Sequence, residues 1–229
     1  MQNFWVVGTD TDVGKTFVTT VLLRDLQQRG VHVTPYKPVQ TGEIVEGDLT
    51  YYYDTTMYEK FTKQQLTKGS LNSYSFKEAA SPHYAAQLEG IVIDHNLLLH
   101  HIELLQNEYD VVICEGAGGL YVPLDASSRS TLLDLIVQSG LPVVLVTRTS
   151  LGTINHTMLS LEALKVRGVH VLGLVFNRFE GTEVELNNIE TILAHSGLHS
   201  AILPKVQGTE QLVTLSVENS SLFERLVKT

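Results

Sequence analysis

The amino-acid sequence predicts an α/β fold: a single doubly wound, mainly parallel sheet with helices on both faces. Three observations lead to this fold class. Apolar runs without alternation suit strands that are covered on both faces, and amphipathic segments of helical length lie between them. The 229 residues suffice for one such domain, 1–229, and are short for two. In such sheets the crossovers are right-handed, and ligands bind at the carboxyl ends of the strands.

The expected strands are runs rich in Val, Ile, Leu and Phe. The first leads into a glycine-containing loop, and the second follows Gly30, a typical helix stop. The central runs are almost free of polar residues, as buried parallel strands require. In chain order, strands are expected at Phe4–Val7, Val31–Tyr36, Asp110–Cys114, Pro142–Thr147, Val169–Phe176 and Ala201–Leu203.

The expected helices fill the stretches between and after these strands. Each has apolar residues at helical spacing on one face and polar residues on the other. In chain order, helices are expected at Lys15–Arg29, Asn96–Gln106, Thr131–Gln138, Ile154–Lys165, Val184–His195 and Ser216–Leu226.

The composition excludes several functional classes. The net charge of −9 argues against a nucleic-acid-binding surface, because phosphate backbones are held by clustered Lys and Arg. No apolar run reaches membrane-spanning length, and the start MQNFWVVGTD lacks the basic region of a signal peptide. The single cysteine, Cys114, leaves no intrachain disulfide and fits a reducing cytoplasm. We therefore expect a cytoplasmic protein without nucleic-acid or membrane partners, which holds any anionic ligand locally.

The stretch GTDTDVGKTF, from Gly8 to Phe17, has the features of a phosphate-binding loop. A chain that leaves a strand and turns into a helix aims successive N–H groups at one spot, where the helix N-terminus adds partial positive charge. Gly14 allows an anion to approach, Lys15 can reach β- and γ-phosphates, and the Thr16 hydroxyl can bind Mg²⁺. The two glycines are separated by five residues rather than the usual four. A plain strand–helix turn is the alternative, but Gly-Lys-Thr at the start of the first helix favours phosphate binding.

The second strand leads into YKPVQTG, which carries Lys37 and Thr41. In a doubly wound sheet this end can lie beside the first loop. Lys37 would then bring a second cation to the γ-phosphate, and the Thr41 hydroxyl would bind the same oxyanion. A solvated lysine before a proline turn is an equally open interpretation. Further on, Asp48 and Asp54 are both candidates for a metal carboxylate.

The stretch DVVICEGAGG places Glu115 at the end of a buried strand. That is where a phosphate-loop enzyme keeps the acid that helps to bind Mg²⁺. The glycine-rich turn expected at Gly116 to Gly119 can present N–H groups to a carboxylate or a phosphate. The alternative is a glycine turn capped by an acid. Cys114 is expected to be a small core residue.

Taken together, five blocks of the chain resemble the dethiobiotin synthetases: GTDTDVGKT, YKPVQTG, SPH at Ser81–His83, EGAGG, and LGTINH at Leu151–His156. The resemblance runs from Asn3 to about Pro204. It implies a P-loop NTPase-like fold and a biotin-pathway ligase that closes a ureido ring on 7,8-diaminononanoate, using CO₂ and ATP with Mg²⁺. It also implies a homodimer.

The same resemblance implies roles for individual residues. Lys15 would hold the phosphates, Lys37 would stabilise a carbamate and developing charge, and Thr11 would join them in catalysis. Mg²⁺ would be bound by Thr16, Asp54 and Glu115. Asp54 is preferred over Asp48 because the number of residues between it and the SPH block suits the family. The nucleotide would contact Asp12, Val13, Gly14, Lys15, Thr16, Phe17, Asp54, Glu115, Asn177, Pro204, Lys205 and Val206, with Asn177 bonding adenine. The substrate would contact Thr41, Gly116, Ala117, Gly118, Gly119 and Asn155, the last from the neighbouring subunit. The family often has Ser at the position of Thr41 and commonly has Glu at that of Asp12.

Other functions remain open at this stage. A nucleotide-switched partitioning or septum-positioning ATPase shares the loop and the sheet, but typically carries an extra lysine early in the loop, which GTDTD lacks. A cobyrinate-type amidoligase needs a glutaminase domain, for which the length leaves no room. A third alternative is a plain nucleotide-binding module without enzymatic activity. Two lysines and two acids that converge at strand ends are more than nucleotide binding alone requires. Phosphate release that depends on diaminononanoate would separate the ligase from the partitioning ATPase.

Overall fold

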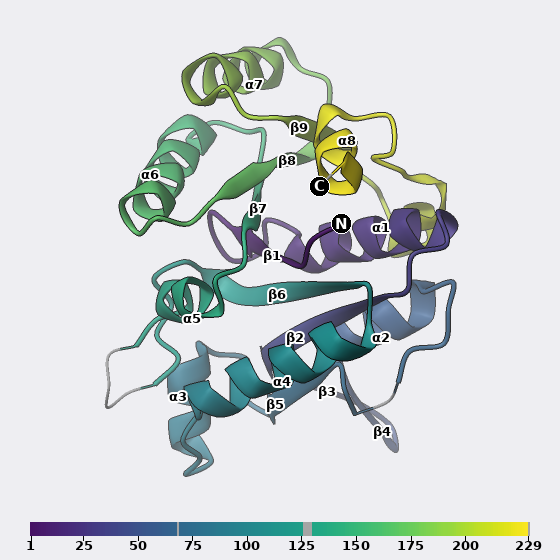
Figure 1. Cartoon of the computed structure of the whole chain (residues 1–229), viewed down its shortest axis with the longest axis vertical. Helices are drawn as coiled ribbons and strands as arrows, with labels where there is room; N and C mark the ends of the chain where they lie inside the picture. The colour runs from purple at the N-terminus through teal and green to yellow at the C-terminus, as the bar shows by residue number, and fades with distance from the viewer. Residues whose placement is uncertain (68, 126–129, 229) are drawn as a thin grey trace.

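The computed structural model describes residues 1–67, 69–125 and 130–228 and is built around one large parallel sheet (Figure 1). Its strands are β1 (Phe4–Gly8), β2 (Val33–Thr41), β5 (Asn72–Phe76), β6 (Val111–Gly119), β7 (Val143–Thr147), β8 (Val171–Phe179) and β9 (Ser200–Pro204). They lie in the order β5-β2-β6-β1-β7-β8-β9, and every neighbouring pair is parallel. The early strands lie on one side of β1 and the late strands on the other. The predicted fold class is confirmed, and β1 lies at the switch point where such sheets bind ligands.

Helices cover both faces of the sheet (Figure 1). They are α1 (Lys15–Gln28), α2 (Tyr53–Phe61), α3 (Pro82–Leu88), α4 (His95–Glu108), α5 (Leu132–Ser139), α6 (Thr153–Val166), α7 (Glu183–Ser196) and α8 (Ser221–Lys228), with a 3₁₀ helix η1 at Thr209–Thr214. One core cluster joins α3 to α7 with Trp5 and Val7, and the other joins α1, α2 and α8 with Phe4 and Val6. Successive residues of β1 therefore point into opposite cores, as in a strand that is buried on both sides. None of the helices in the described ranges combines the length and the apolar character needed to cross a membrane.

Local sequence signals explain where some helices begin and end. Thr131 and Asp134 form a capping box at the start of α5, as Thr182 and Glu185 do at α7. Gly140 ends α5 with a φ of 66°, a left-handed conformation in which glycine avoids the Cβ strain of other residues. The observed bounds of these two helices differ from the expected ones by a single residue at each end.

Several strands run further than the sequence analysis expected. β2 continues to Thr41, and β8 passes Asn177 before it ends. β6 passes Glu115 and continues through the glycines, because Gly119 still pairs with Gly8 of β1. The prediction of a turn at Gly116–Gly119 was therefore wrong: the whole segment belongs to the strand, with a left-handed residue at Gly118 (φ 66°).

The closing helix is shorter than expected. It begins at Ser221 rather than Ser216. The residues before it are held in a turn instead, because the backbone N–H of Val217 is bound by the Asp25 carboxylate of α1 at 2.7 Å.

The stretch from Thr41 to Leu88 holds elements that the sequence analysis did not predict. These are the antiparallel hairpin of β3 (Glu43–Glu46) and β4 (Leu49–Tyr52), helix α2, edge strand β5 and helix α3. The hairpin side chains are half-buried or exposed, and β5 reads NSYSF, which is mostly polar. None of these elements presents the long apolar run by which the central strands are recognised.

Candidate active site

The loop from Gly8 to Lys15 joins β1 to α1 and forms a concave cradle. Gly14 is the N-cap of α1, with φ 91° and ψ 35°, a left-handed conformation that suits glycine. Asp12 also has a positive φ, 57°, which is uncommon for a residue with a Cβ and is typical of functional loops. The first N–H groups of α1 have no carbonyl partner within the helix, so they remain to bind an anion.

The side chain of Lys15 lies over this loop. Its Nζ donates a hydrogen bond to the carbonyl oxygen of Asp10 at 3.0 Å, and the residue is buried. Burial first, and then the nearby ammonium of Lys37, lower the pKa of Lys15 to about 8, although nearby carboxylates act in the opposite direction. An anion bound in the cradle would stabilise the charged form of this lysine.

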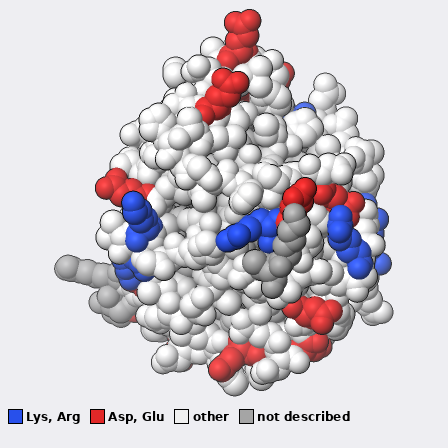
Figure 2. Space-filling view, turned by 45° about the horizontal axis from the view of Figure 1, so that its top comes forward, with Lys and Arg blue, Asp and Glu red and all other residues white. Residues whose placement is uncertain are grey.

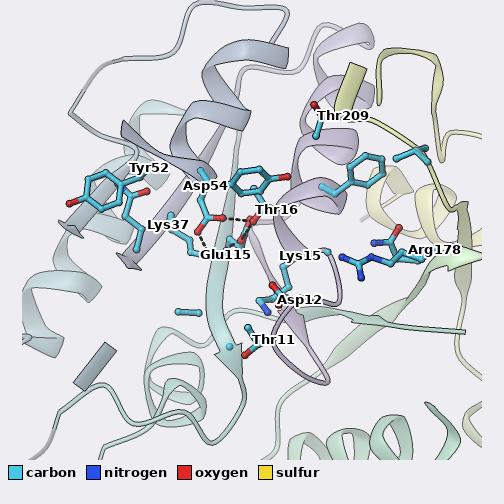
Figure 3. A pocket seen from close by; sticks show the side chains of 18 of the residues that line it. Thr11, Asp12, Lys15, Thr16, Lys37, Tyr52, Asp54, Glu115, Arg178 and Thr209 are labelled. Carbon is cyan, nitrogen blue, oxygen red and sulfur yellow. Dashed lines mark hydrogen bonds and ion pairs between the residues drawn. The ribbon is translucent and has the colours of Figure 1, made fainter. Parts of the chain in front are cut away.

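Three oxygen-bearing side chains meet beside the loop: Thr16 of α1, Asp54 of α2 and Glu115 of β6 (Figure 3). The Thr16 Oγ1 lies 2.5 Å from Asp54 Oδ1 and 2.8 Å from Glu115 Oε1. A hydroxyl has one hydrogen to donate, so Thr16 can satisfy only one of these two carboxylates at a time. A hydroxyl and two carboxylates are oxygen ligands of the kind that Mg²⁺ prefers, and in this structure the ammonium group of Lys37 lies against both carboxylates.

Lys37 of β2 brings an ammonium group into the same cluster. Its Nζ lies 2.8 Å from Asp54 Oδ2 and 2.7 Å from Glu115 Oε1, and donates to the carbonyl oxygen of Gly116 at 3.1 Å. Its three N–H bonds are therefore all used. Tyr58 of α2 donates to the other Glu115 oxygen, Oε2. Glu115 is fully buried, and both of its oxygens have partners.

The groups in this cluster stabilise one another's charged or neutral forms. Burial tends to lower the pKa of Lys37, but Asp54 and Glu115 outweigh it and raise that pKa above its ordinary value. Burial tends to raise the pKa of Asp54, but Lys37 and the Thr16 hydroxyl outweigh it and lower the pKa. Burial, and then Glu115, raise the pKa of Tyr58. At neutral pH the cluster therefore contains a charged lysine, an ionised Asp54 and a tyrosine that can donate a hydrogen bond.

These groups border a cavity of about 680 Å³, a size typical of sites for small molecules. In Figure 3 the side chains of Lys15, Thr16 and Asp54 approach it from the loop, α1 and α2, and Arg178 approaches from the side of β8. Most of the predicted site residues line it: Thr11, Asp12, Gly14, Lys15, Thr16, Phe17, Lys37, Thr41, Asp54, Glu115, Ala117, Gly118, Asn177, Pro204, Lys205 and Val206.

Four predicted residues do not line this cavity. Val13 is fully buried behind the loop, where its carbonyl oxygen accepts a hydrogen bond from Asn177 Nδ2 at 2.9 Å. Gly116 is buried, and its carbonyl oxygen accepts a hydrogen bond from the ammonium group of Lys37. Gly119 borders a second hollow, of about 790 Å³, between the loop and α6. Asn155 is exposed on α6 and lines neither hollow.

The structure separates the two candidate metal carboxylates. Asp54 lies in the first turn of α2, within the cluster. Asp48 lies in the exposed turn between β3 and β4. From the sequence alone, Asp54 could be preferred over Asp48 only because its spacing from Ser81–His83 resembles that of the family.

Sequence reasoning missed several residues at the site, among them Tyr58, which contacts Glu115, and Arg178. The cavity is also lined by residues that were not predicted: Val39, Gln40, Tyr52, Tyr53, Gln207, Gly208 and Thr209. Tyr58 follows Asp54 by four residues, which places both side chains on one face of α2. If the helix had been predicted, this four-residue spacing would have placed Tyr58 at the site together with Asp54. Arg178 lines the cavity next to Asn177, with a φ of 63°. Nothing in its sequence neighbourhood signals a left-handed residue inside a strand.

Charges on the outer surface are scattered. On the face in Figure 2, basic and acidic side chains of the described residues are interspersed, without a continuous basic stretch among them. Four described cationic side chains line the cavity: Lys15, Lys37, Arg178 and Lys205.

Comparisons with known proteins place this geometry in context. A family model described as an AAA domain matches residues 2–214. The chain is 61% identical over 228 residues to an ATP-dependent dethiobiotin synthetase BioD of Lysinibacillus sphaericus, a match that covers 100% of this chain and 97% of the relative. A protein of the same name from Fusobacterium nucleatum subsp. nucleatum is 39% identical over 217 residues, covering 95% of this chain and 97% of that protein.

Solved structures with a similar fold are more distant in sequence. The septum site-determining protein MinD of Pyrococcus horikoshii, complexed with Mg-ADP, has a TM-score of 0.62 and 17% identity, covering 100% of this chain and 90% of that chain. The MinD cell division protein of Aquifex aeolicus also has a TM-score of 0.62, at 12% identity, covering 100% of this chain and 98% of that chain. At such identities the likeness concerns the fold alone.

Proposed function

This chain belongs to the family of ATP-dependent dethiobiotin synthetases, and from that premise we propose that it closes a ureido ring on 7,8-diaminononanoate. The reaction consumes CO₂ and ATP, requires Mg²⁺, and gives dethiobiotin, ADP and phosphate. The observation that carries the proposal is the meeting of Lys15, Lys37, Asp54 and Glu115 with a phosphate loop in one cavity. Such an arrangement suits phosphoryl transfer, in which catalysis consists mainly of positioning and charge stabilisation.

The chemistry explains why ATP is needed. One substrate amine takes up CO₂ as a carbamate. A carbamate oxygen then attacks the γ-phosphorus of ATP, ADP leaves, and a carbamic–phosphoric anhydride forms. The second amine attacks the carbamoyl carbon, loses a proton and displaces phosphate, which closes the ring. Phosphorylation is required because an unmodified carbamate oxygen is a poor leaving group.

The metal would be held by Thr16, Asp54 and Glu115. The fit rests on the Thr16 hydroxyl, which has two carboxylate oxygens within 2.8 Å and only one hydrogen for them. Mg²⁺ prefers such oxygen ligands and usually shares them with phosphate groups of the substrate. Bound there, it would neutralise charge on the β- and γ-phosphates.

The two lysines would serve different parts of the reaction. Lys15 donates to a loop carbonyl, the Asp10 oxygen, and can exchange that bond for a phosphate oxygen by a side-chain movement alone. Lys37 uses its N–H bonds on Asp54, Glu115 and Gly116, so it must exchange one of them to reach the carbamate or the γ-phosphoryl group. In the arrangement that the structure shows, Asp54 and Glu115 raise the pKa of Lys37, so the ammonium is charged before this exchange begins.

The remaining lining residues divide into two ends of the cavity. Asn177, Pro204, Lys205 and Val206 would hold the nucleobase, since they lie on and beside β8 and β9, away from β2. The substrate would occupy the end formed by β2 and β6. There it would contact Thr11, Thr41, Ala117 and Gly118, which line the cavity, whereas the contacts first expected of Gly116 and Gly119 find no support because neither residue lines it.

We further propose that two copies of the chain form a homodimer through the second hollow. Tyr121, Leu159 and Val166 at this hollow are 65%, 57% and 77% exposed, and grouped exposed apolar side chains are typical of protein interfaces. Asn155, exposed on the same α6, would then reach the substrate of the neighbouring subunit. Analytical ultracentrifugation of the purified chain tests the oligomeric state directly. For localisation we propose the cytoplasm, which suits a single buried Cys114.

One assay tests the proposed function. Purified protein is incubated with ATP, Mg²⁺, bicarbonate and diaminononanoate, and the cyclic urea is detected by mass while phosphate release is followed. The expected result is dethiobiotin in equal amount to phosphate, with neither formed when diaminononanoate is left out. Phosphate release that does not depend on diaminononanoate would instead favour a nucleotide-switched ATPase of the same fold.

A further inference from the structure

The side chain of Asn177 ties strand β8 to the phosphate loop. Asn177 is 3% exposed, and its Nδ2 donates a hydrogen bond to the carbonyl oxygen of Val13 at 2.9 Å. A backbone carbonyl only accepts, so the NH₂ group of the amide must face the loop. The same residue lines the nucleotide cavity. It therefore lies between the wall of the base pocket and the back of the phosphate cradle.

The fit between the amide and the loop leaves no room for a side chain at Gly14. A Cβ added to Gly14 would lie 2.1 Å from Asn177 Nδ2, far inside van der Waals contact. On the other side, a Cβ added to Gly8 would lie 2.7 Å from Val13 Cγ2. Val13 and Gly14 are thus enclosed between Gly8 and Asn177.

This enclosure fixes the direction of an N–H group in the cradle. The carbonyl of Val13 and the N–H of Gly14 belong to one planar trans peptide, in which they point in opposite directions. When the carbonyl is bound by Asn177 on one side, the Gly14 N–H must point to the other side. The carbonyl of Gly14 in turn accepts from the N–H of Val18 at 3.0 Å, which joins this peptide to the first turn of α1.

We propose that Asn177 is a positioning residue for the phosphate cradle: it binds the Val13 carbonyl and thereby aims the Gly14 N–H at the phosphate chain of the nucleotide. The inference rests on the ATP-dependent function proposed above and is additional to the adenine contact expected of this residue. Nδ2 holds the loop, while Oδ1 is an acceptor that matches the amino group of a nucleobase. One amide thus links occupancy of the base pocket to the shape of the cradle.

The test uses ligands that separate the phosphates from the base. Binding of Mg-tripolyphosphate, Mg-ATP and AMP is measured by calorimetry for the parent protein, Asn177→Ala and Asn177→Asp. The aspartate variant keeps the cavity filled and removes the donor. A positioning role predicts that both variants bind tripolyphosphate about tenfold more weakly, the fold-change expected for one lost hydrogen bond. It also predicts a larger loss for ATP than for AMP.

A matched control comes from a second buried asparagine. Asn188 is 6% exposed, and its Nδ2 donates to the carbonyl oxygen of Thr149 at 2.9 Å, away from the loop. Asn188→Ala removes the same kind of hydrogen bond and should leave the affinity for tripolyphosphate at the parent value. Thermal unfolding of all variants shows whether loss of stability alone accounts for weaker binding.

The outcomes distinguish the inference from the function on which it rests. If tripolyphosphate binding is unchanged in both Asn177 variants while ATP and AMP weaken by the same factor, Asn177 contacts only the base and the inference is wrong. The same holds if Asn188→Ala weakens tripolyphosphate as much as Asn177→Ala does. Where the parent binds tripolyphosphate too weakly to measure, the ratio of ATP to AMP affinity decides in the same way. A parent protein that makes no dethiobiotin and binds no ATP would overturn the proposed function together with the inference.

Discussion

The ammonium of Lys37 and the carboxylate of Glu115 form an ion pair of 2.7 Å, in which the side chains are 5% and 0% exposed. The two residues lie on β2 and β6, which are neighbouring parallel strands. Tyr36 pairs with Cys114 between these strands, so the residues that follow them, Lys37 and Glu115, lie side by side in the sheet. Removing one partner of a buried pair leaves the other charge unpaired, so the pair contributes to the structure of the site as well as to its charge.

Lys37→Ala should nearly abolish ring closure while leaving ATP binding mostly intact. The variant loses the cation that we propose to stabilise the γ-phosphoryl and carbamate groups, and the loss of such a donor typically lowers the rate by about 10²–10³-fold. The loop N–H groups and Lys15 remain to hold the nucleotide. Dethiobiotin formation by mass detection and ATP affinity by calorimetry measure the two effects. Turnover at the parent rate would show that the role assigned to Lys37 is wrong.

Lys15→Ala should instead weaken nucleotide binding itself. Lys15 lies directly over the loop, and a charge-assisted hydrogen bond to phosphate is worth about 1.5–3 kcal/mol, or roughly tenfold to a hundredfold in affinity. Calorimetry with Mg-ATP measures the change. Arg29→Ala removes the same charge from a surface ion pair with Glu218 and serves as the control. Equal affinities of the parent and Lys15→Ala would count against the cradle.

The elements that the sequence predicts are those with a strong local signal. The central strands are unbroken apolar runs such as PVVLVT at Pro142–Thr147, because both of their faces are buried. The stretch from Thr41 to Leu88 gave no such signal, because the β3–β4 hairpin is only half-buried or exposed and β5 lies at the edge of the sheet. Strand ends were also misjudged. Pairing with β1 holds the glycines after Glu115 in the sheet, and this depends on a partner strand far away in the sequence.

The same distinction applies to the site. Lys15 and Thr16 follow from a local motif, and Glu115 from its place after an apolar run. The contact of Lys37 with Glu115 joins residues 78 apart in the chain, so spacing alone left its role open. Asp54 and Tyr58 lie on a helix that the sequence analysis did not predict. Their partners are far from them in the sequence, so only the three-dimensional structure identifies them.

Arg178 provides a case in which stability and binding should change in opposite directions. Its φ of 63° is strained for a residue with a Cβ, and its side chain lines the cavity in which we propose that the nucleotide binds (Figure 3). Arg178→Gly should raise the free energy of unfolding by about 0.5–1 kcal/mol, since glycine relieves the strain. It should also weaken Mg-ATP binding several-fold. Arg178→Ala should lose the same affinity without gaining stability, and parent-like ATP affinity in both variants would contradict a role for the guanidinium.

The capping box of α5 should make the free energy of unfolding depend on pH in the acidic range. The hydrogen bond from Arg167, and then that from Thr131, lower the pKa of Asp134 from 3.8 to about 2. Because the pKa is lower in the folded state, this stabilisation is complete above about pH 4 and is lost as the pH falls toward 2. Asp134→Ala should therefore reduce the free energy of unfolding by about 1 kcal/mol at pH 7, and by less at pH 3. Urea unfolding of both proteins at the two pH values measures the difference, and an equal difference at both would argue against the lowered pKa.

Gly14 and Asn177 should show coupled effects on nucleotide binding. Gly14→Ala introduces a Cβ that would lie 2.1 Å from Asn177 Nδ2, in a residue whose φ is 91°. Both the contact and the backbone strain act against the parent loop geometry, so this variant should bind Mg-ATP much more weakly than the parent, with an affinity that calorimetry still measures. Asn177→Ala removes the contact but not the strain. Gly14→Ala should therefore weaken binding less when it is added to Asn177→Ala than when it is added to the parent, with a coupling of about 1 kcal/mol or more. Calorimetry on the parent, both single variants and the double variant completes the cycle. Strictly additive losses would mean that the left-handed φ alone requires glycine at position 14, and that the neighbouring amide has no part in that requirement.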